Sequence, residues 1–216
     1  MHPPPTTHPQ QRQLAMDLSA TMAAIYGRGW CDGTGGNFSC VLHRNPLRLL
    51  MAPSGVHKGA VRPEDLIVVD GNAAVRRGRG RASAETLLHL AIVRETSAGA
   101  VLHTHSQAAT LLSQQLPPGE PGTAGHLRLE GLEMLKGLEG ISSHTNAVEV
   151  PVLANDQDLH RLSAAAGPHL AAAPHGLLIA GHGLYAWGPT LAVARRHLEI
   201  HEFLLEHAWR RLLLSR

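Results

Sequence analysis

The feature that most constrains this 216-residue chain is a short apolar run that ends in two histidines one residue apart. The run Gly99-Ala-Val-Leu leads directly into His103-Thr-His105, and its small and branched residues predict a buried strand. Side chains at positions i and i+2 of a strand point to the same face of the sheet. Both imidazoles are therefore expected to lie close enough together to hold a single ion.

A third histidine with a similar setting lies far downstream. His182 sits between two glycines, at the end of the strand-like run 176–180. Three imidazoles with an open fourth position are a common arrangement for a catalytic divalent metal. Because the chain has sixteen histidines, a His-x-His pair alone fits chance about as well as a ligand pair. The glycines beside His182 and the loops described below favour the metal site.

Composition indicates an ordinary globular domain. Hydrophobic residues make up 44% of the chain and aromatic residues 3%, so the core must rely on Leu, Val, Ile and Ala. No apolar run approaches the roughly 20 residues that a membrane span needs. Residues 1–13 lack the apolar region of a secretory signal and are expected to form a disordered tail. The two cysteines, Cys31 and Cys40, make no disulfide framework, which fits a cytoplasmic protein.

The charge pattern gives little support for a nucleic-acid partner. The formal net charge is +2, and the single basic cluster is the run RRGRGR at 76–81. Such a cluster could attract nucleic acid or another anion. No aromatic residues that could stack on bases are interleaved with it. We therefore interpret the run as a solvated turn between a strand and a helix, and expect neither nucleic acid nor a membrane as partner.

Turn and helix signals divide the chain into runs of strands with helices between some of them. This pattern is neither strictly alternating nor all-β, and no repeat or linker interrupts it, which predicts one α/β domain with a mixed sheet covered by helices. A mobile Pro/Gly loop is expected over 117–125, and Pro168 and Pro174 are expected to bound a break. Besides the strand before His103, we expect strands over 37–42, 47–52, 66–69, 147–152 and 176–180, and helices over 11–27, 83–97, 107–115, 129–138, 156–166 and 189–213.

Three segments have the features of anion-binding loops. The glycine-rich turn 33–39 and the turn 52–58 allow backbone amides to converge on an anion, and 83–85 begins a helix whose dipole favours one. Each segment alone is more often an ordinary turn. Together with a metal triad, they suggest a phosphorylated substrate with a metal over its carbonyl. The groups expected to contact the phosphate are Asn37, Ser54, Gly55, Lys58 and Ser83.

Two carboxylates are candidates for proton transfer. Glu85 begins the helix that precedes the histidine strand, where it could benefit from the helix dipole or act as a base and metal ligand. Glu133 lies in Leu132-Glu-Met-Leu-Lys136 after the Pro/Gly loop. The ordinary interpretation of Glu133 is an exposed helical residue.

These segments together resemble the class II aldolase/adducin family over residues 14–213. The matching motifs run from Arg28-Gly-Trp30 and GTGGNFS through APSGVHK, RPEDL, SAETLLH, HTHS and LEMLKG to GHGLYAWG. TGGN and HxH are shared across the family, whereas the combination is specific. The resemblance implies one catalytic domain over 14–216 with a mainly antiparallel, class II aldolase-like sheet. It also implies ring-like homotetramers with active sites between subunits.

Carried over by position, the resemblance implies roles for individual residues. His103, His105 and His182 would bind one Zn²⁺ per subunit. Glu133 would be the catalytic acid/base, and Glu85 matches the glutamate that aldolase members use as base and metal ligand. Asn37, Ser54, Gly55 and Ser83 match phosphate contacts.

The RGW, APSG and EM-K-G segments favour one reaction within the family. They imply a hydro-lyase that removes water from 5-methylthioribulose 1-phosphate, giving 2,3-diketo-5-methylthiopentyl 1-phosphate in methionine salvage. Retro-aldol cleavage of a ketose 1-phosphate and epimerisation of a pentulose phosphate begin from similar metal chelation and remain alternatives. A non-catalytic, adducin-like assembly module is less well supported, because such a module has no need of three histidines and two candidate carboxylates.

Overall fold

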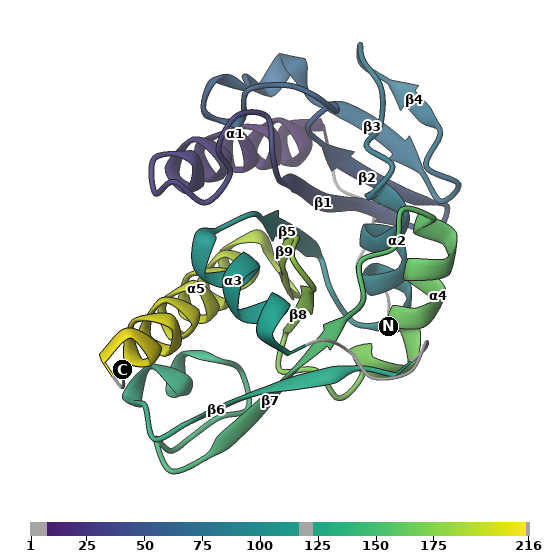
Figure 1. Ribbon diagram of the computed structural model, residues 1–216. Helices are drawn as coiled ribbons and strands as arrows, with labels where there is room; N and C mark the ends of the chain where they lie inside the picture. Colours follow the sequence, from purple (N-terminus) through teal and green to yellow (C-terminus); the bar gives the residue numbers. More distant parts are fainter. Residues whose placement is uncertain (1–7, 117–122, 215–216) are drawn as a thin grey trace.

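The computed structural model describes residues 8–116 and 123–214, and a single sheet runs through them. Its strands are β1 Asn37–Arg44, β2 Leu47–Met51, β3 Ile67–Asp70, β4 Val75–Arg77, β5 Ala100–Thr104, β6 Gly125–Glu130, β7 Ala147–Leu153, β8 Gly176–Ile179 and β9 Gly183–Gly188. The strand order is β4-β3-β2-β1-β5-β9-β8-β7-β6 (Figure 1). Only the β7–β8 pair of this nine-stranded sheet is parallel, so the predicted mixed, mainly antiparallel sheet is confirmed.

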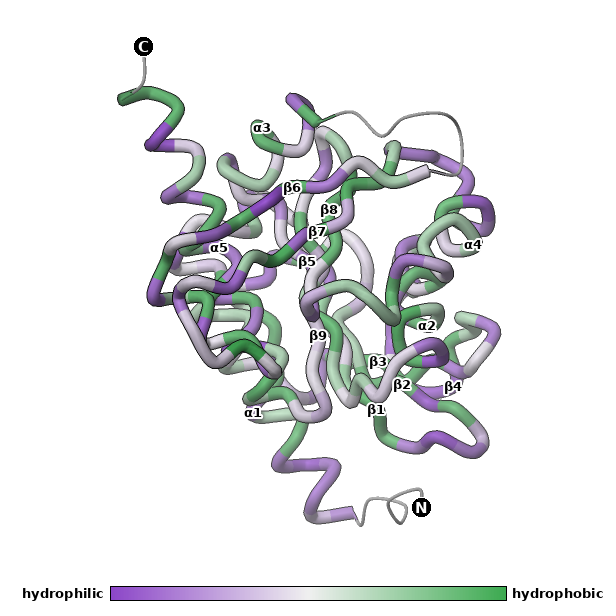
Figure 2. Tube along the Cα trace, turned by 90° about the horizontal axis from the view of Figure 1, so that it is seen from below, coloured by the Kyte–Doolittle hydropathy of each residue, from purple (hydrophilic) through white to green (hydrophobic). Residues whose placement is uncertain are grey.

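Helices cover both faces of this sheet. They are α1 His8–Tyr26, α2 Thr86–Glu95, α3 Gln107–Gln115, α4 Leu159–Leu170 and α5 Leu191–Leu214, with 3₁₀ turns η1 Lys58–Ala60, η2 Pro63–Asp65 and η3 Glu133–Gly137. Figure 2 shows α1 and α5 on one side of the strands and α2 and α4 on the other. Helix α3 packs on α5 and shares its hydrophobic core with α1. The molecule is therefore a helix–sheet–helix arrangement with two separate hydrophobic cores.

Alternate residues of β5 enter different cores. Ala100 and Leu102 pack in the core under α1, α3 and α5, whereas Val101 packs in the core under α2 and α4. By the same alternation, His103 faces the α2 side and Thr104 faces the α5 side. The strand thus presents its histidine on one face of the sheet and its threonine on the other.

Several element boundaries differ from the prediction. Helix α1 begins at His8, so residues 8–13, predicted as tail, are helical, while residues 1–7 lie outside the described part of the chain. Residues 125–130 form a strand where the start of a helix was predicted at 129, because Leu127 and Leu129 alternate with exposed residues and pair with β7. Pro168 lies inside α4 rather than at a break.

The remaining sequence features have the following places in the structure. The basic run 76–81 overlaps the end of β4, a short strand at the sheet edge. Residues 117–122 of the expected mobile loop lie outside the described residues. Cys31 and Cys40 are both free and buried. Among the described residues, no helix has the length and apolar character needed to span a membrane.

Candidate active site

The candidate site lies at one end of the central strands β1 and β5. Strands β1 and β5 are antiparallel, and Asn37 at the start of β1 pairs with His103 near the end of β5. Strand β2 ends at Met51, opposite Ser39 of β1, so the loop that follows β2 leaves the sheet at this same end of the strands. Antiparallel pairing therefore brings both predicted glycine-containing loops next to the histidine strand.

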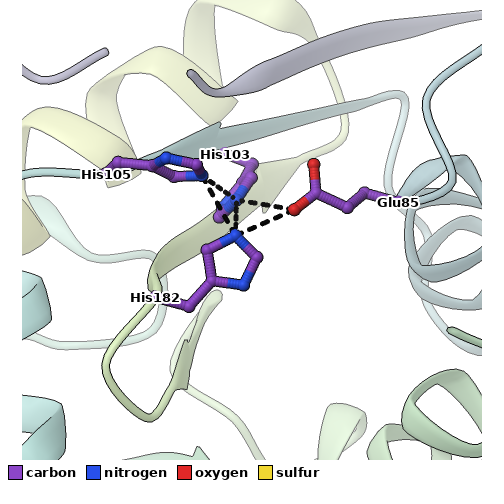
Figure 3. Close-up of side chains that lie close together, drawn as sticks. All are labelled: Glu85, His103, His105 and His182. Atoms are coloured by element: carbon purple, nitrogen blue, oxygen red, sulfur yellow. Dashed lines mark hydrogen bonds and ion pairs between the residues drawn. The ribbon is translucent and has the colours of Figure 1, made fainter. Parts of the chain in front are cut away.

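Four side chains from three segments converge here (Figure 3). The Nε2 atoms of the histidines are separated by 2.8 Å for His103–His105, 3.1 Å for His105–His182 and 3.4 Å for His103–His182. Glu85 Oε1 lies 2.9 Å from the Nε2 of His182 and 3.5 Å from that of His103. The structure thus brings together all three predicted histidines and one of the two predicted carboxylates.

Glycine makes this close approach possible at two points. A side chain at Gly183 would collide with the carbonyl oxygen of Thr104, so only glycine lets the turn that carries His182 lie against the end of β5. At Gly35, a Cβ atom would lie 2.9 Å from Nδ1 of His105 and 3.2 Å from the carbonyl oxygen of Asp32. The glycine-rich loop 33–36 therefore fits directly against one of the candidate ligands.

The orientation of the His103 ring is set by its surroundings. Its Nδ1 lies 2.9 Å from the carbonyl oxygen of Leu184, which can only accept, so Nδ1 carries a hydrogen and Nε2 is the nitrogen that faces the other histidines. The ring stacks on Tyr185 at a centroid distance of 3.9 Å. Burial, followed by the neighbouring His103 and His182, lowers the pKa of His105 to about 3, so its imidazole is neutral. Three imidazole nitrogens that converge in this way are suited to binding a cation.

The donor set fits a divalent metal. The four possible ligand atoms lie within 4.8 Å of one another. A tetrahedral metal bound at 2.0–2.1 Å holds its nitrogen ligands about 3.3 Å apart, which is close to the separations found among the histidines. Lone pairs packed this closely repel one another unless a proton or a cation lies between them. A metal ion held by His103, His105 and His182 would relieve that repulsion, with Glu85 beside it.

Neighbouring side chains fix the orientation of Glu85. The amide of Asn37 donates a hydrogen bond to its Oε2, and the hydroxyl of Ser83 donates to the same oxygen at 3.4 Å. Burial alone would raise the pKa of this carboxyl, but hydrogen bonds with His103 and His182 hold the pKa well below its usual range. Glu85 is therefore a carboxylate aimed at the histidines, and two residues predicted as phosphate contacts support it.

Lys58 connects the two glycine-containing loops. Its side chain is 1% exposed, and Nζ donates to the carbonyl oxygens of Thr34 at 2.9 Å and Val56 at 3.0 Å. Burial lowers its pKa. A Cβ atom added to Gly55, which has a φ of +73°, would have no atom within 4 Å, so the tip of the second loop is open. Phosphate contacts by Lys58, Ser54 and Gly55 stay predictions.

Glu133 is not part of this cluster. It begins η3, its side chain is 72% exposed, and it lies 2.5 Å from Nζ of Lys136 and 3.8 Å from Nδ1 of His144. The Lys136 ammonium lowers the pKa of this carboxyl. Within the described residues, neither of the two clusters that could bind a metal includes Glu133. A catalytic role for Glu133 therefore stays a prediction.

A second group of possible ligands is already occupied by hydrogen bonds. Glu139, His175 and His197 offer ligand atoms within 4.8 Å. However, Nδ1 of His197 donates to the carbonyl oxygen of Trp187 at 2.7 Å, and Nε2 accepts the backbone N–H of Glu139 at 3.2 Å. A metal would have to break one of these hydrogen bonds. His197 instead links the backbone after η3, at Glu139, to the end of β9, at Trp187.

Comparison with known proteins agrees with this geometry. Residues 16–209 match the family model described as "Class II Aldolase and Adducin N-terminal domain". A curated protein called methylthioribulose-1-phosphate dehydratase from Methylococcus capsulatus is 44% identical over 195 residues, which cover 89% of this chain and 91% of the relative. The protein of the same name from Pseudomonas aeruginosa is 41% identical, covering 95% of this chain and 98% of the relative.

Solved structures with the same fold include proteins that carry the names of different activities. L-fuculose-1-phosphate aldolase from Thermus thermophilus has a TM-score of 0.70 and 27% identity, covering 95% of this chain and 96% of that one. YgbL from Escherichia coli has a TM-score of 0.76 and 23% identity, covering 92% and 89%, and shares the fold. The two comparisons together identify one architecture.

Proposed function

The chain belongs to the class II aldolase and adducin family, and we propose that it is a metal-dependent hydro-lyase that converts 5-methylthioribulose 1-phosphate into 2,3-diketo-5-methylthiopentyl 1-phosphate. The observation that carries this proposal is the convergence of His103, His105, His182 and Glu85 beside two glycine-containing loops. Relatives of 40% identity and more, matched over about nine-tenths of the chain, carry the dehydratase name.

His103, His105 and His182 would hold the metal, which we propose to be Zn²⁺. When bound, a divalent metal at this position supplies Lewis acidity to carbonyl and hydroxyl oxygens of a substrate and makes the neighbouring C3 proton more acidic. Leu184 and Tyr185 fix the tautomer and the plane of the His103 ring. These contacts keep a lone pair directed at the metal position throughout the reaction.

The loops would anchor the phosphate at C1 and align the bonds that react. The open tip at Gly55, the Ser54 hydroxyl and the turn at Ser83 that precedes α2 would offer donors near the histidines. Lys58 holds the two loops together through their carbonyl oxygens and adds positive charge behind them. This arrangement suits a dianionic phosphate.

We assign the proton transfers to Glu133 of a neighbouring subunit. Its carboxylate would remove the C3 proton, and the C4 hydroxyl would leave as water after receiving a proton. The enol formed then tautomerises to the diketone. Two observations support this assignment: Glu133 is exposed, and the EM-K-G segment resembles that of the family. Together they favour a homo-oligomer, expected to be a tetramer, with active sites between subunits. Glu85 is the second candidate base and a possible metal ligand.

Two substitutions test these roles separately. Glu133→Gln is expected to lower turnover by at least about 100-fold and to leave the bound metal unchanged, because only the proton transfer is removed. Glu85→Gln is expected to weaken metal binding itself. Turnover close to that of the wild type in the Glu133→Gln protein would transfer the acid/base role to Glu85.

A further inference from the structure

A carboxylate is buried directly behind the metal-binding strand, and the roles proposed above do not use it. Glu202 lies on α5, which packs against β5 and β9, and its residue exposure is 2%. Its Oε1 accepts a hydrogen bond of 2.5 Å from Oγ1 of Thr104. It also accepts a hydrogen bond from the hydroxyl of Ser106.

The two hydroxyl residues alternate with the two metal-binding histidines. In the segment 103–106, His103 points to the α2 side of the sheet, while Thr104 points to the α5 side, where Glu202 lies. The histidines therefore lie on one face of the segment, and the anchors lie on the other.

Ser106 extends this connection to a further helix. Its hydroxyl oxygen accepts the backbone N–H of Ala109 at 3.1 Å and thereby caps the N-terminus of α3. One carboxylate thus connects α5, the end of β5 and the start of α3.

His105 depends on such anchoring more than His103 does. The ring of His103 is held by the carbonyl of Leu184 and by stacking on Tyr185. His105 lies beyond the last residue of β5, and its backbone N–H donates to the carbonyl oxygen of Trp30 at 2.8 Å. Its backbone position is therefore set by this one bond and by what holds the residues on either side of it, Thr104 and Ser106.

We propose that Glu202 is a positioning residue, which locks the segment 103–106 from behind so that His103 and His105 present their Nε2 atoms at metal-binding separation. This inference rests on the metal site of the proposed function. A carboxylate suits the task because it accepts from both hydroxyls and so fixes the rotamers of Thr104 and Ser106. An apolar residue at this position would fill the same space and leave neither hydroxyl hydrogen with this acceptor.

The first test is metal affinity in the Glu202→Gln protein. An amide replaces one of the two acceptor oxygens with an NH₂ group that only donates, so it is a poorer acceptor for the two hydroxyls than the carboxylate is. Cobalt(II) replaces other divalent metals at histidine sites, and its visible absorption reports ligand geometry. Titration of metal-free protein with cobalt is expected to give about tenfold weaker binding and an altered absorption band. Glu206→Gln is the matched control, because Glu206 lies one turn further along α5 and pairs with Arg210 at the surface.

A pair of variants at Thr104 tests the same contact from the other side. Thr104→Val keeps the shape and removes the donor to Glu202, so cobalt binding is expected to weaken several-fold. Thr104→Ser keeps the hydroxyl and is expected to recover most of that loss. This pair remains informative if the Glu202→Gln protein folds poorly, and circular dichroism checks the fold of each variant.

The outcomes separate this inference from the proposed function. Wild-type cobalt affinity and absorption in both Glu202→Gln and Thr104→Val would overturn the positioning role. Equal losses in Thr104→Val and Thr104→Ser would also overturn it, since the hydroxyl would not matter. Wild-type protein that binds cobalt but dehydrates no substrate overturns only the function, whereas protein that binds no cobalt overturns both.

Discussion

Each histidine of the candidate metal site is held by a different kind of contact. His103 is fixed by a carbonyl oxygen and an aromatic ring, His182 is carried on a turn that only glycine allows, and His105 fits against a glycine of the 33–36 loop. The sequence predicted that these three histidines lie close together, because strand alternation and flanking glycines are local signals. It could not predict Leu184 or Tyr185 as supports, because these contacts depend on the pairing of β5 with β9.

Gly35→Ala is predicted to weaken metal binding about tenfold with a small effect on folding. The added Cβ would lie 2.9 Å from Nδ1 of His105 and would displace the ring. Gly33→Ala is the control: φ is +63° and no atom lies within 4 Å of the added Cβ, so it should cost about 1 kcal/mol of stability without changing metal affinity. Isothermal titration with zinc checks both, and equal affinities for the two variants would contradict the account.

A buried histidine outside the site should make stability depend on pH. His201 is fully buried, and burial lowers its pKa from 6.5 to about 4, although its hydrogen bond to the carbonyl of Pro174 opposes the shift. Between these two pKa values the unfolded chain binds a proton that the folded protein does not, so stability falls as the pH falls. This group should remove about 1 kcal/mol of the free energy of unfolding between about pH 6.5 and about pH 5.5.

His201→Gln tests this prediction, because glutamine keeps a donor for the carbonyl of Pro174 and cannot titrate. Urea unfolding of metal-free protein at the two pH values should show a pH dependence smaller by about 1 kcal/mol in the variant. His207→Gln, further along α5, is the matched control. The same reduction in both variants would show that the effect does not come from His201.

At the scale of elements, the long helices and most buried strands followed from sequence periodicity, whereas the buried strand β9 and the short edge strand β4 were not predicted. Strand β6 was missed because Leu127 and Leu129 are stabilised in a strand by pairing with β7, which local sequence does not reveal. Helix α1 was predicted to begin three residues too late. The loop motifs suggested that the two loops lie near the histidines, but the contact itself follows from the pairing of β1 with β2 and β5, which local sequence does not reveal.

The 3₁₀ turn that carries Glu133 rests on α5 through a glycine. A Cβ at Gly137 would collide with the side chain of Ile200, so Gly137→Ala is expected to displace η3. Turnover should fall about tenfold while metal content stays constant, because only the proposed acid/base moves. Ile200→Ala removes both colliding atoms and leaves only Cβ, at 3.8 Å, so it should restore much of the turnover in the double variant. Undiminished turnover in Gly137→Ala would contradict a catalytic role for this turn.

At the scale of the whole molecule, the account requires sites shared between subunits. His103→Ala protein should lack metal, and Glu133→Gln protein should lack the acid/base, so each alone should be inactive. Mixed oligomers can combine the histidines of one subunit with Glu133 of another, and random mixing of equal amounts should restore about a quarter of the sites. Steady-state assay of co-expressed, tandem-purified hybrids measures this recovery. Hybrids as inactive as their parents would contradict the assignment of Glu133 to a neighbouring site.

The most direct test of the central claim is mass spectrometry of the products formed from 5-methylthioribulose 1-phosphate by zinc-loaded protein. The account predicts a product lighter by one water, and no such product after metal removal by a chelator. Dihydroxyacetone phosphate would instead identify a retro-aldol cleavage, with Glu85 as the principal base, and an isomer of unchanged mass would identify an epimerase. Substrate recovered unaltered would contradict the dehydratase assignment.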